Sequence, residues 1–171
     1  GSLGSRTLNN GWKENIKQVL EKDYQLIWQT GKLDYKNILE ETKDIHSRNI
    51  QIVEFIKNME MAYSAADVIV SRAGAIAISE LAIAKKPVLL VPFPFAAEDH
   101  QTKNAQTLVD KNAAKMVKDT EMKEKFWNTL SEICENEDLR KEMAQNLDFF
   151  AKPKATEEIV DEIFKNLNIK E

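Results

Sequence analysis

The sequence predicts an α/β fold, a Rossmann-like parallel sheet with helices on both faces. Two observations carry this prediction. Short apolar runs rich in Val, Ile and Leu alternate with longer stretches of helical periodicity, and the runs are continuous rather than alternating apolar with polar. Strands that are covered by helices on both faces show this continuous pattern. In such folds ligands bind beyond the carboxyl ends of the strands, in the loops that enter the following helices.

The elements are expected as follows. The first helix covers 7–22, where Leu8, Trp12, Ile16 and Val19 recur at spacings of three and four. Strands are expected over 24–28, 50–53, 67–70, 87–91 and 114–117. The helices between them are expected over 33–43, 59–65, 74–84 and 98–111. The remainder is helix-rich, with helices expected over 121–134, 137–150 and 155–167 and with Pro153 between the last two.

Composition bounds the class of protein. The 171 residues suit one domain over 1–171, and 43% apolar with 30% charged residues indicates a folded core. A net charge of −4 argues against a nucleic-acid partner. The longest uncharged stretch, 87–97, is too short to span a bilayer, which takes about 20 mostly apolar residues. The single cysteine, Cys134, excludes an internal disulfide and suits a reducing compartment, so we expect a cytoplasmic location. No Cys/His cluster has the spacing of a metal site, and no metal is expected.

The first residues form a glycine-containing loop, Gly1 to Gly4, directly before the first helix. Such a loop normally follows a strand, and none precedes it here. Two interpretations are open: the loop belongs to an interrupted strand–loop–helix unit, or the glycines are a cloning remnant. Spacing alone favours the remnant.

The segment 71–80 separates a predicted strand from a predicted helix and has the features of a nucleotide site. Gly74 allows a ligand to approach the backbone closely. The unpaired amides at the start of the helix, which favour an anion such as phosphate, belong to Ala75, Ile76 and Ala77. Glu80 could accept hydrogen bonds from the two hydroxyls of a ribose. The alternative is a tight strand–helix turn with Glu80 on the solvated face of the helix.

Polar residues also follow the strand expected over 87–91. The loop 92–97 is apolar and rich in proline, and the next helix begins with polar side chains. His100 and Gln101 could donate hydrogen bonds to sugar hydroxyls or to phosphate. The alternative is an ordinary helix start that is capped by Glu98 or Asp99, with His100 as a surface residue.

A third candidate segment follows the strand expected over 50–53. Phe55 could stack on a flat base, and the backbone of Ile56 could contact the edge of that base. The alternative, which the residues alone favour, is that Phe55 and Met59 are core residues at helical spacing. Because all three segments follow parallel strands, we expect their loops to open on one edge of the sheet and to share one cleft.

Three segments, 1–9, 66–80 and 92–105, resemble the carboxy-terminal half of the MurG family of glycosyltransferase family 28. These bacterial enzymes transfer N-acetylglucosamine (GlcNAc) from UDP-GlcNAc to lipid I and so make lipid II for peptidoglycan. The resemblance covers nearly the whole chain. It implies one half of a GT-B architecture, the half that binds the sugar nucleotide. It also implies that Ser2 to Asn9 is a native loop, whereas Gly1 stays ambiguous.

The resemblance assigns roles by position. The matched residues are Ser2 at the donor phosphate, Phe55 and Ile56 at the uracil with Met59 nearby, Ala75, Ile76 and Ala77 along the nucleotide, Glu80 at the ribose, and His100 and Gln101 near the GlcNAc hydroxyls. Two positions depart from the family. Ala77 stands where relatives often have threonine, and His100 replaces a glutamine of some relatives, which leaves Gln101 as the safer sugar contact.

The mechanism that the resemblance implies is an inverting transfer without a metal or other cofactor. The lipid I hydroxyl attacks the anomeric carbon, and UDP leaves. The catalytic base, the lipid I site and the membrane surface belong to an amino-terminal half. We therefore expect this chain to bind UDP-GlcNAc weakly and to be inactive alone, and we expect the full-length protein at the cytoplasmic face of the inner membrane.

Three alternatives to this function are open. The first is the donor-binding subunit of another two-part UDP-GlcNAc transferase, such as the eukaryotic dolichol-pathway enzyme. The second is a UDP-sugar epimerase of similar fold. The third is a non-enzymatic interaction domain with a nucleotide cleft. Binding of UDP to the isolated domain separates the last alternative from the others, since a ligand that binds only the native state stabilises it.

Overall fold

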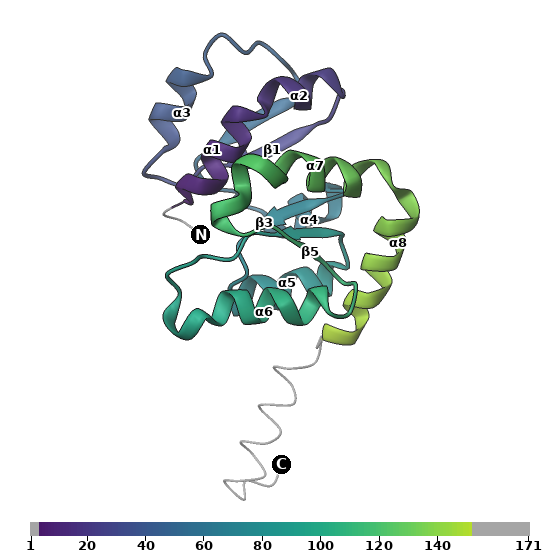
Figure 1. The fold of residues 1–171 in the computed structure, drawn as a ribbon. Helices are drawn as coiled ribbons and strands as arrows, with labels where there is room; N and C mark the ends of the chain where they lie inside the picture. Colours follow the sequence, from purple (N-terminus) through teal and green to yellow (C-terminus); the bar gives the residue numbers. More distant parts are fainter. Residues whose placement is uncertain (1–3, 152–171) are drawn as a thin grey trace, which may run out of the picture.

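The computed structural model describes residues 4–151 of the chain (Figure 1). Its strands are β1 (Leu26–Gln29), β2 (Ile50–Val53), β3 (Ile69–Ser71), β4 (Val88–Leu90) and β5 (Lys115–Met116). Its helices are α1 (Arg6–Glu14), α2 (Ile16–Glu21), α3 (Tyr35–Glu41), α4 (Met59–Ala65), α5 (Ala75–Ala84), α6 (His100–Val109), α7 (Met122–Glu135) and α8 (Glu137–Asn146). Three 3-10 turns complete it: η1 (Ala97–Asp99), η2 (Asp119–Glu121) and η3 (Leu147–Phe150). Ser2 and the helix expected over 155–167 lie outside the described residues.

Each of the expected strands is present, and the expectation of one helix over 7–22 is wrong. That stretch divides into α1 and α2 at Asn15. The Asn15 side chain donates a hydrogen bond of 2.8 Å to the carbonyl of Gly11, and its own backbone amide is shared between Gly11 and Trp12. Asparagine side chains compete in this way for backbone groups, and the regular helix is interrupted where they do.

The strands are parallel, as predicted, but they form two sheets rather than one. β1 pairs with β2, and β3, β4 and β5 pair in that order. Among residues 4–151, no strand pairing joins the two sheets. Figure 1 shows β1 with α1–α3 in the upper part of the molecule and β3–β5 with α5 and α6 below.

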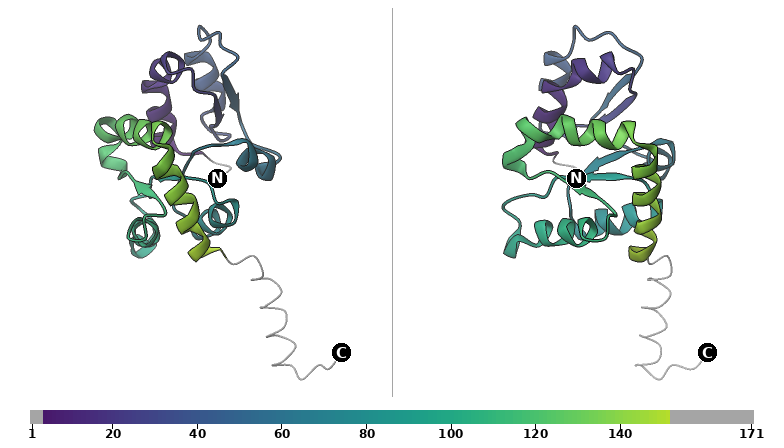
Figure 2. Two further views of the ribbon diagram at one scale, coloured as in Figure 1. Left: turned by 90° about the vertical axis from the view of Figure 1, so that its right-hand side faces the viewer. Right: turned by 45° about the vertical axis from the view of Figure 1, so that its right-hand side comes forward.

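The three-stranded sheet has helices on both faces, which confirms the predicted layering. Val88 and Leu90 of β4 pack with the residues of α5 and α6, whereas Leu89 and the following Val91 pack with those of α7 and α8. All four side chains are fully buried. Helix α7 lies between the two parts of the molecule (Figure 2), and its Trp127 packs against the apolar clusters of both.

The two-stranded sheet is covered on one face only. Leu26 and Trp28 of β1 pack against Ile16 and Val19 of α2, with Ile38 of α3 in the same cluster. On the opposite face, Ile27 is 46% exposed. Helices on both faces are therefore not found for this part of the fold among the described residues.

This topology places the loops that matter. The loops β2–α4, β3–α5 and β4–α6 each begin at the carboxyl end of a parallel strand.

In residues 4–151, no helix combines the length and apolar character needed to cross a membrane. No cluster of three or more His, Cys, Asp or Glu side chains suited to a metal ion occurs in the same part of the chain.

Candidate functional site

The β3–α5 loop ends in an uncapped helix start. Gly74 is the N-cap residue of α5, and no side chain caps the helix there. Its backbone angles, φ −68° and ψ 149°, are accessible to any residue. A Cβ atom on Gly74 would meet no atom of the described chain within 4 Å. Neither the backbone nor packing therefore requires glycine, and the space beside Gly74 is open to a ligand.

The first turn of α5 faces solvent. Ala75 is exposed, Ile76 is 78% exposed and Ala77 is half-buried. The helix has ten residues, so its unpaired amides and its dipole create a positive end that suits an anion. The three residues whose amides are predicted to bind phosphate, Ala75, Ile76 and Ala77, thus lie at one accessible helix terminus.

Glu80 lies farther along α5 and is exposed. It accepts a hydrogen bond of 3.0 Å from the hydroxyl of Tyr63 on α4. Burial, followed by the neighbouring Glu80, raises the pKa of Tyr63 to about 12. The carboxylate of Glu80 is therefore held against α4 by a neutral donor that keeps its proton at physiological pH.

Gln101 has a structural role in addition to the direct sugar contact that the sequence predicts for it. Its side-chain oxygen accepts hydrogen bonds from the backbone amides of Ala73, at 3.2 Å, and Phe93, at 3.0 Å. One turn later, Asn104 donates to the carbonyl of Ala73 at 3.2 Å. Helix α6 therefore fastens the β3–α5 and β4–α6 loops to each other. The Gln101 Nε2 group is the part of this side chain that remains for donation to a sugar.

The β4–α6 loop presents aromatic rings. Phe93 is 41% exposed and Phe95 is 84% exposed, and their rings meet edge to face with centroids 5.7 Å apart.

The residues at the start of α6 have an unusual backbone. Glu98 and Asp99 both have positive φ, 52° and 54°, which is uncommon for consecutive residues other than glycine. His100 is exposed, and its Nδ1 lies 2.6 Å from the carbonyl oxygen of Ala97. Asp99 is the N-cap residue of α6, but its side chain makes no capping hydrogen bond.

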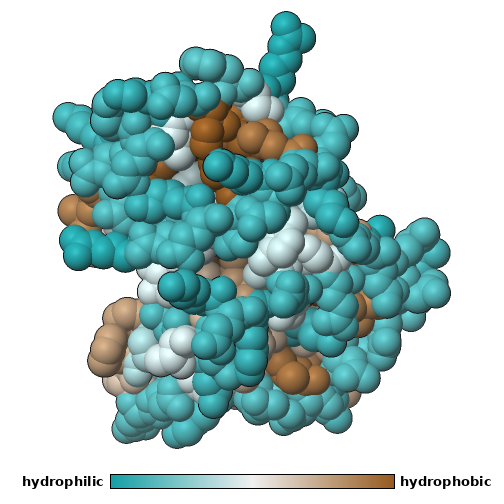
Figure 3. All heavy atoms as spheres, turned by 45° about the horizontal axis from the view of Figure 1, so that its top comes forward, coloured by the Kyte–Doolittle hydropathy of each residue, from teal (hydrophilic) through white to brown (hydrophobic). Residues whose placement is uncertain are grey.

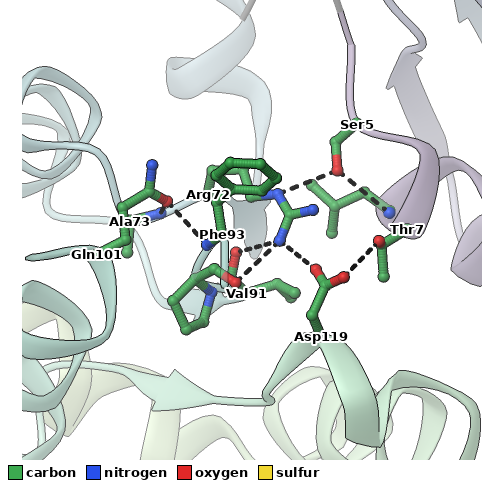
Figure 4. Close-up of polar contacts among 10 residues, drawn as sticks. Ser5, Thr7, Arg72, Ala73, Val91, Phe93, Gln101 and Asp119 are labelled. Carbon is green, nitrogen blue, oxygen red and sulfur yellow. Dashed lines mark hydrogen bonds and ion pairs between the residues drawn. The ribbon is translucent and has the colours of Figure 1, made fainter. Parts of the chain in front are cut away.

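Arg72 is the central polar residue behind these loops, and the sequence interpretation gave it no role (Figure 4). Its Nη1 group donates to the carbonyls of Val91, at 3.1 Å, and Pro92, at 3.0 Å, and forms an ion pair with Asp119. Its Nε group donates to the hydroxyl of Ser5 at 3.0 Å. The guanidinium lies 5.5 Å from the centroid of the Phe93 ring.

Asp119 extends this network to the start of α1. Its second oxygen accepts a hydrogen bond of 2.6 Å from the hydroxyl of Thr7. The ion pair with Arg72 is largely shielded, because the side chains are 18% and 19% exposed. The network therefore ties the loop before α1 to the ends of β3 and β4 and to η2, as Figure 4 shows. The sequence signal was a single arginine directly after a β-strand, which does not reveal its partners.

Gly4, just before α1, lies in close contact with the end of β1. Gly4 has φ +84°, and a Cβ atom there would lie 2.2 Å from the carbonyl oxygen of Thr30 at the end of β1. The buried Asn9 side chain donates to the same carbonyl at 2.9 Å and accepts a hydrogen bond from the indole of Trp28 at 3.0 Å. Gly4 and Asn9 therefore both pack against the end of β1.

The β2–α4 loop carries the predicted base-binding residues. Phe55 is 54% exposed, so the alternative that it is a core residue is wrong. The backbone amide of Ile56 already donates to the side-chain oxygen of Gln29 at 2.9 Å, which leaves its carbonyl for the edge of a base. Met59 is half-buried at the start of α4.

Hydrogen bonds connect two of the predicted site residues, Gln101 and Glu80, to neighbouring segments of the fold. Gln101 is bonded to the β3–α5 loop, and Glu80 is bonded to α4, the helix that follows Phe55 and Ile56. A surface cavity of about 280 Å³ lies beside the network, and it is lined by Pro92, Pro94, Asp99, Thr102, Lys118, Asp119 and Thr120. None of the predicted site residues lines this cavity. On the face shown in Figure 3, apolar side chains form separate patches within a mostly hydrophilic surface.

Comparison with known proteins identifies the family. The family model described as "Glycosyltransferase family 28 C-terminal domain" matches residues 1–161. The chain belongs to this family. Its parallel strands, crossover helices and uncapped α5 terminus are therefore those of a family 28 domain.

Relatives and a solved structure agree with this assignment. One relative, from Cytophaga hutchinsonii, is 46% identical over 98% of the chain and 44% of its own length. Another, from Flavobacterium psychrophilum, is 40% identical over 96% of the chain and 44% of its own length. Both are named UDP-N-acetylglucosamine–N-acetylmuramyl-(pentapeptide) pyrophosphoryl-undecaprenol N-acetylglucosamine transferase.

The crystal structure of Acinetobacter baumannii MurG matches the family 28 domain with a TM-score of 0.82 and 37% identity. The match covers 96% of this chain and 48% of that one. The chain thus spans somewhat less than half the length of the relatives and structure that it matches. The predicted GT-B half-domain fold is confirmed.

Proposed function

We propose that this domain is the donor-binding half of a transferase that moves GlcNAc from UDP-GlcNAc to the lipid-linked acceptor lipid I. The observation that carries the proposal is the α5 terminus, where unpaired amides and the unfilled space beside Gly74 meet the requirements of a diphosphate. The names of the relatives support the choice of UDP-GlcNAc and of a hexosyltransferase activity.

The donor is expected to lie across the carboxyl ends of the strands. The amides of Ala75, Ile76 and Ala77 are proposed to hold the diphosphate, with Ser2 at the same group, and Glu80 is proposed to accept from the ribose hydroxyls. Phe55 and the carbonyl of Ile56, with Met59 nearby, are proposed for the uracil. Gln101 Nε2 and His100 are proposed for the GlcNAc hydroxyls.

The chemistry follows from these contacts. The acceptor hydroxyl oxygen forms a bond to the anomeric carbon while the bond from that carbon to the diphosphate oxygen breaks, so that UDP leaves with an additional negative charge. Fixed amides and the positive end of α5 stabilise that charge without reorganising. The base that takes the acceptor proton, the lipid I site and the contact with the cytoplasmic face of the membrane are proposed for the other half of a longer protein.

Binding of UDP to this chain tests the proposal. Calorimetric titration with UDP and UDP-GlcNAc should show binding that is weakened at least tenfold by Gly74→Val, which fills the open space beside the helix terminus. Glu80→Gln should weaken binding too, whereas the matched change Glu60→Gln, on the exposed first turn of α4, should not. Thermal unfolding of each variant checks that the fold is intact. Binding that ignores Gly74→Val and Glu80→Gln would contradict the assigned site, and no response to millimolar UDP would favour a non-enzymatic interaction domain.

The two-part transferase alternative concerns how the halves are connected. A purified chain that transfers GlcNAc to lipid I by itself would contradict the division of labour proposed here. A chain that binds UDP-GlcNAc and becomes active only when the other half is added agrees with it.

A further inference from the structure

We propose that Tyr63 is a positioning residue that holds Glu80 in the orientation needed to accept both ribose hydroxyls, and that it thereby sets a preference for ribonucleotides over dideoxyribonucleotides. This inference rests on the proposed function, because it concerns the ribose contact of the same site. The sequence alone assigns Tyr63 no role.

The geometry comes from two packed helices. Tyr63 lies on α4, Glu80 lies on α5, and the Tyr63 hydroxyl donates to Glu80 Oε2 at 3.0 Å. The Tyr63 ring packs against the buried cluster that includes Leu81 and Leu147. Because the ring is held by this packing, its hydroxyl is a fixed donor at the surface.

The carboxylate of Glu80 needs such a fixed donor. Glu80 is exposed, and an unrestrained glutamate side chain in that setting samples several rotamers, which costs entropy when a ligand selects one of them. Glu80 takes part in none of the ion pairs formed by residues 4–151. The bond from Tyr63 is thus the contact that selects its rotamer.

The same bond leaves the acceptor capacity of Glu80 largely intact. A carboxylate offers about four lone-pair sites, and the phenol uses one of them on Oε2. A neutral phenol does not cancel the negative charge, as a lysine or arginine would. The remaining sites on Oε1 and Oε2 match a vicinal diol, which presents two neighbouring hydroxyl donors.

The test compares ribose with a sugar that lacks both hydroxyls. Calorimetric titration measures the affinity of the chain for UDP and for 2′,3′-dideoxy-UDP, in the wild type and in Tyr63→Phe, which keeps the ring and removes only the hydroxyl. We expect Tyr63→Phe to weaken UDP binding about fivefold to twentyfold, as for one hydrogen bond to a charged group near the surface, and to leave dideoxy-UDP binding within about twofold. The matched control is Tyr35→Phe, at the start of α3.

A second comparison separates positioning from packing. In a Glu80→Gln background, the change Tyr63→Phe should have little further effect on UDP binding, because the two residues act as a unit. Equal losses for UDP and dideoxy-UDP, or no loss for either, would overturn the role of Tyr63 while leaving the proposed function intact. A wild-type chain that binds UDP and dideoxy-UDP equally would overturn the ribose role of Glu80 and this inference with it. A wild-type chain that binds neither would overturn the proposed function itself.

Discussion

Replacing Arg72 with methionine should strongly destabilise the domain. Methionine keeps the unbranched stem of arginine and removes the guanidinium. The change leaves Asp119 without its ion-pair partner and removes the donors from the carbonyls of Val91 and Pro92 and from Ser5. The network that joins the loop before α1 to the strand ends is then broken at its centre.

The magnitude follows from burial and from the number of lost partners. Removing one member of a buried ion pair costs about 3–5 kcal/mol, because the remaining charge is left uncompensated. The Arg72 and Asp119 side chains are 18% and 19% exposed, so water relieves part of that cost. We therefore expect Arg72→Met to lower the free energy of unfolding by about 2–4 kcal/mol, a large fraction of the stability of a small domain.

Urea unfolding followed by tryptophan fluorescence measures this change, since the chain has three tryptophans. Arg48→Met, at an exposed arginine, is the matched control and should change the free energy of unfolding by less than about 0.5 kcal/mol. A double-mutant cycle with Asp119→Asn should give a coupling energy of about 1–3 kcal/mol. A loss below 1 kcal/mol for Arg72→Met, or a coupling energy near zero, would show that the network does not hold the loops together.

Three further predictions concern the loops and the core. Gly4→Ala should lower the free energy of unfolding by about 2 kcal/mol or more, because residue 4 has φ +84° and the added Cβ would lie 2.2 Å from the carbonyl oxygen of Thr30. Gly74→Ala is the control and should change the free energy of unfolding by less than about 0.5 kcal/mol. Chemical denaturation of the two variants measures the difference. Gln101→Met should cost about 1–3 kcal/mol, since two backbone amides lose their acceptor, and should also weaken UDP-GlcNAc binding in the same calorimetric titration. Burial raises the pKa of the Cys134 thiol to about 11, so the folded state retains a proton that the unfolded state loses near pH 9. The free energy of unfolding should therefore fall as pH rises from 9 to 10, and it should fall less steeply in Cys134→Ala, as denaturation curves at each pH will measure. The same dependence on pH in the wild type and in Cys134→Ala would contradict the raised pKa of this thiol.

The sequence was sufficient for features that depend on local pattern. Continuous apolar runs such as 87–91 predicted parallel strands with helices on both faces, and β4 confirms this because Val88 and Leu89 pack against opposite helical layers. The glycine before α5 predicted an accessible helix terminus, which the structure contains. Patterns of this kind reflect the burial of each residue and the geometry of its own segment, so they can be read without tertiary contacts.

Features that depend on distant partners could not be predicted. The oxygen of Gln101 is used by amides 28 and 8 residues away, and Arg72 meets Asp119, which lies 47 residues along the chain. The amide of Ile56 is taken by Gln29, so only the carbonyl of this residue is left for the base contact that the sequence predicts for its backbone. Spacing in a sequence does not say which side chains meet in space, and these pairings are set by tertiary packing.

The proposed site requires the loops β2–α4, β3–α5 and β4–α6 to bind one nucleotide sugar together. Amide chemical-shift mapping by NMR during a titration with UDP-GlcNAc measures whether they do. We expect the amides of Phe55, Ala75, Ile76 and Gln101 to shift along a single saturation curve, with one dissociation constant for all of them. Shifts that are confined to one loop, or that saturate at different concentrations in different loops, would contradict it.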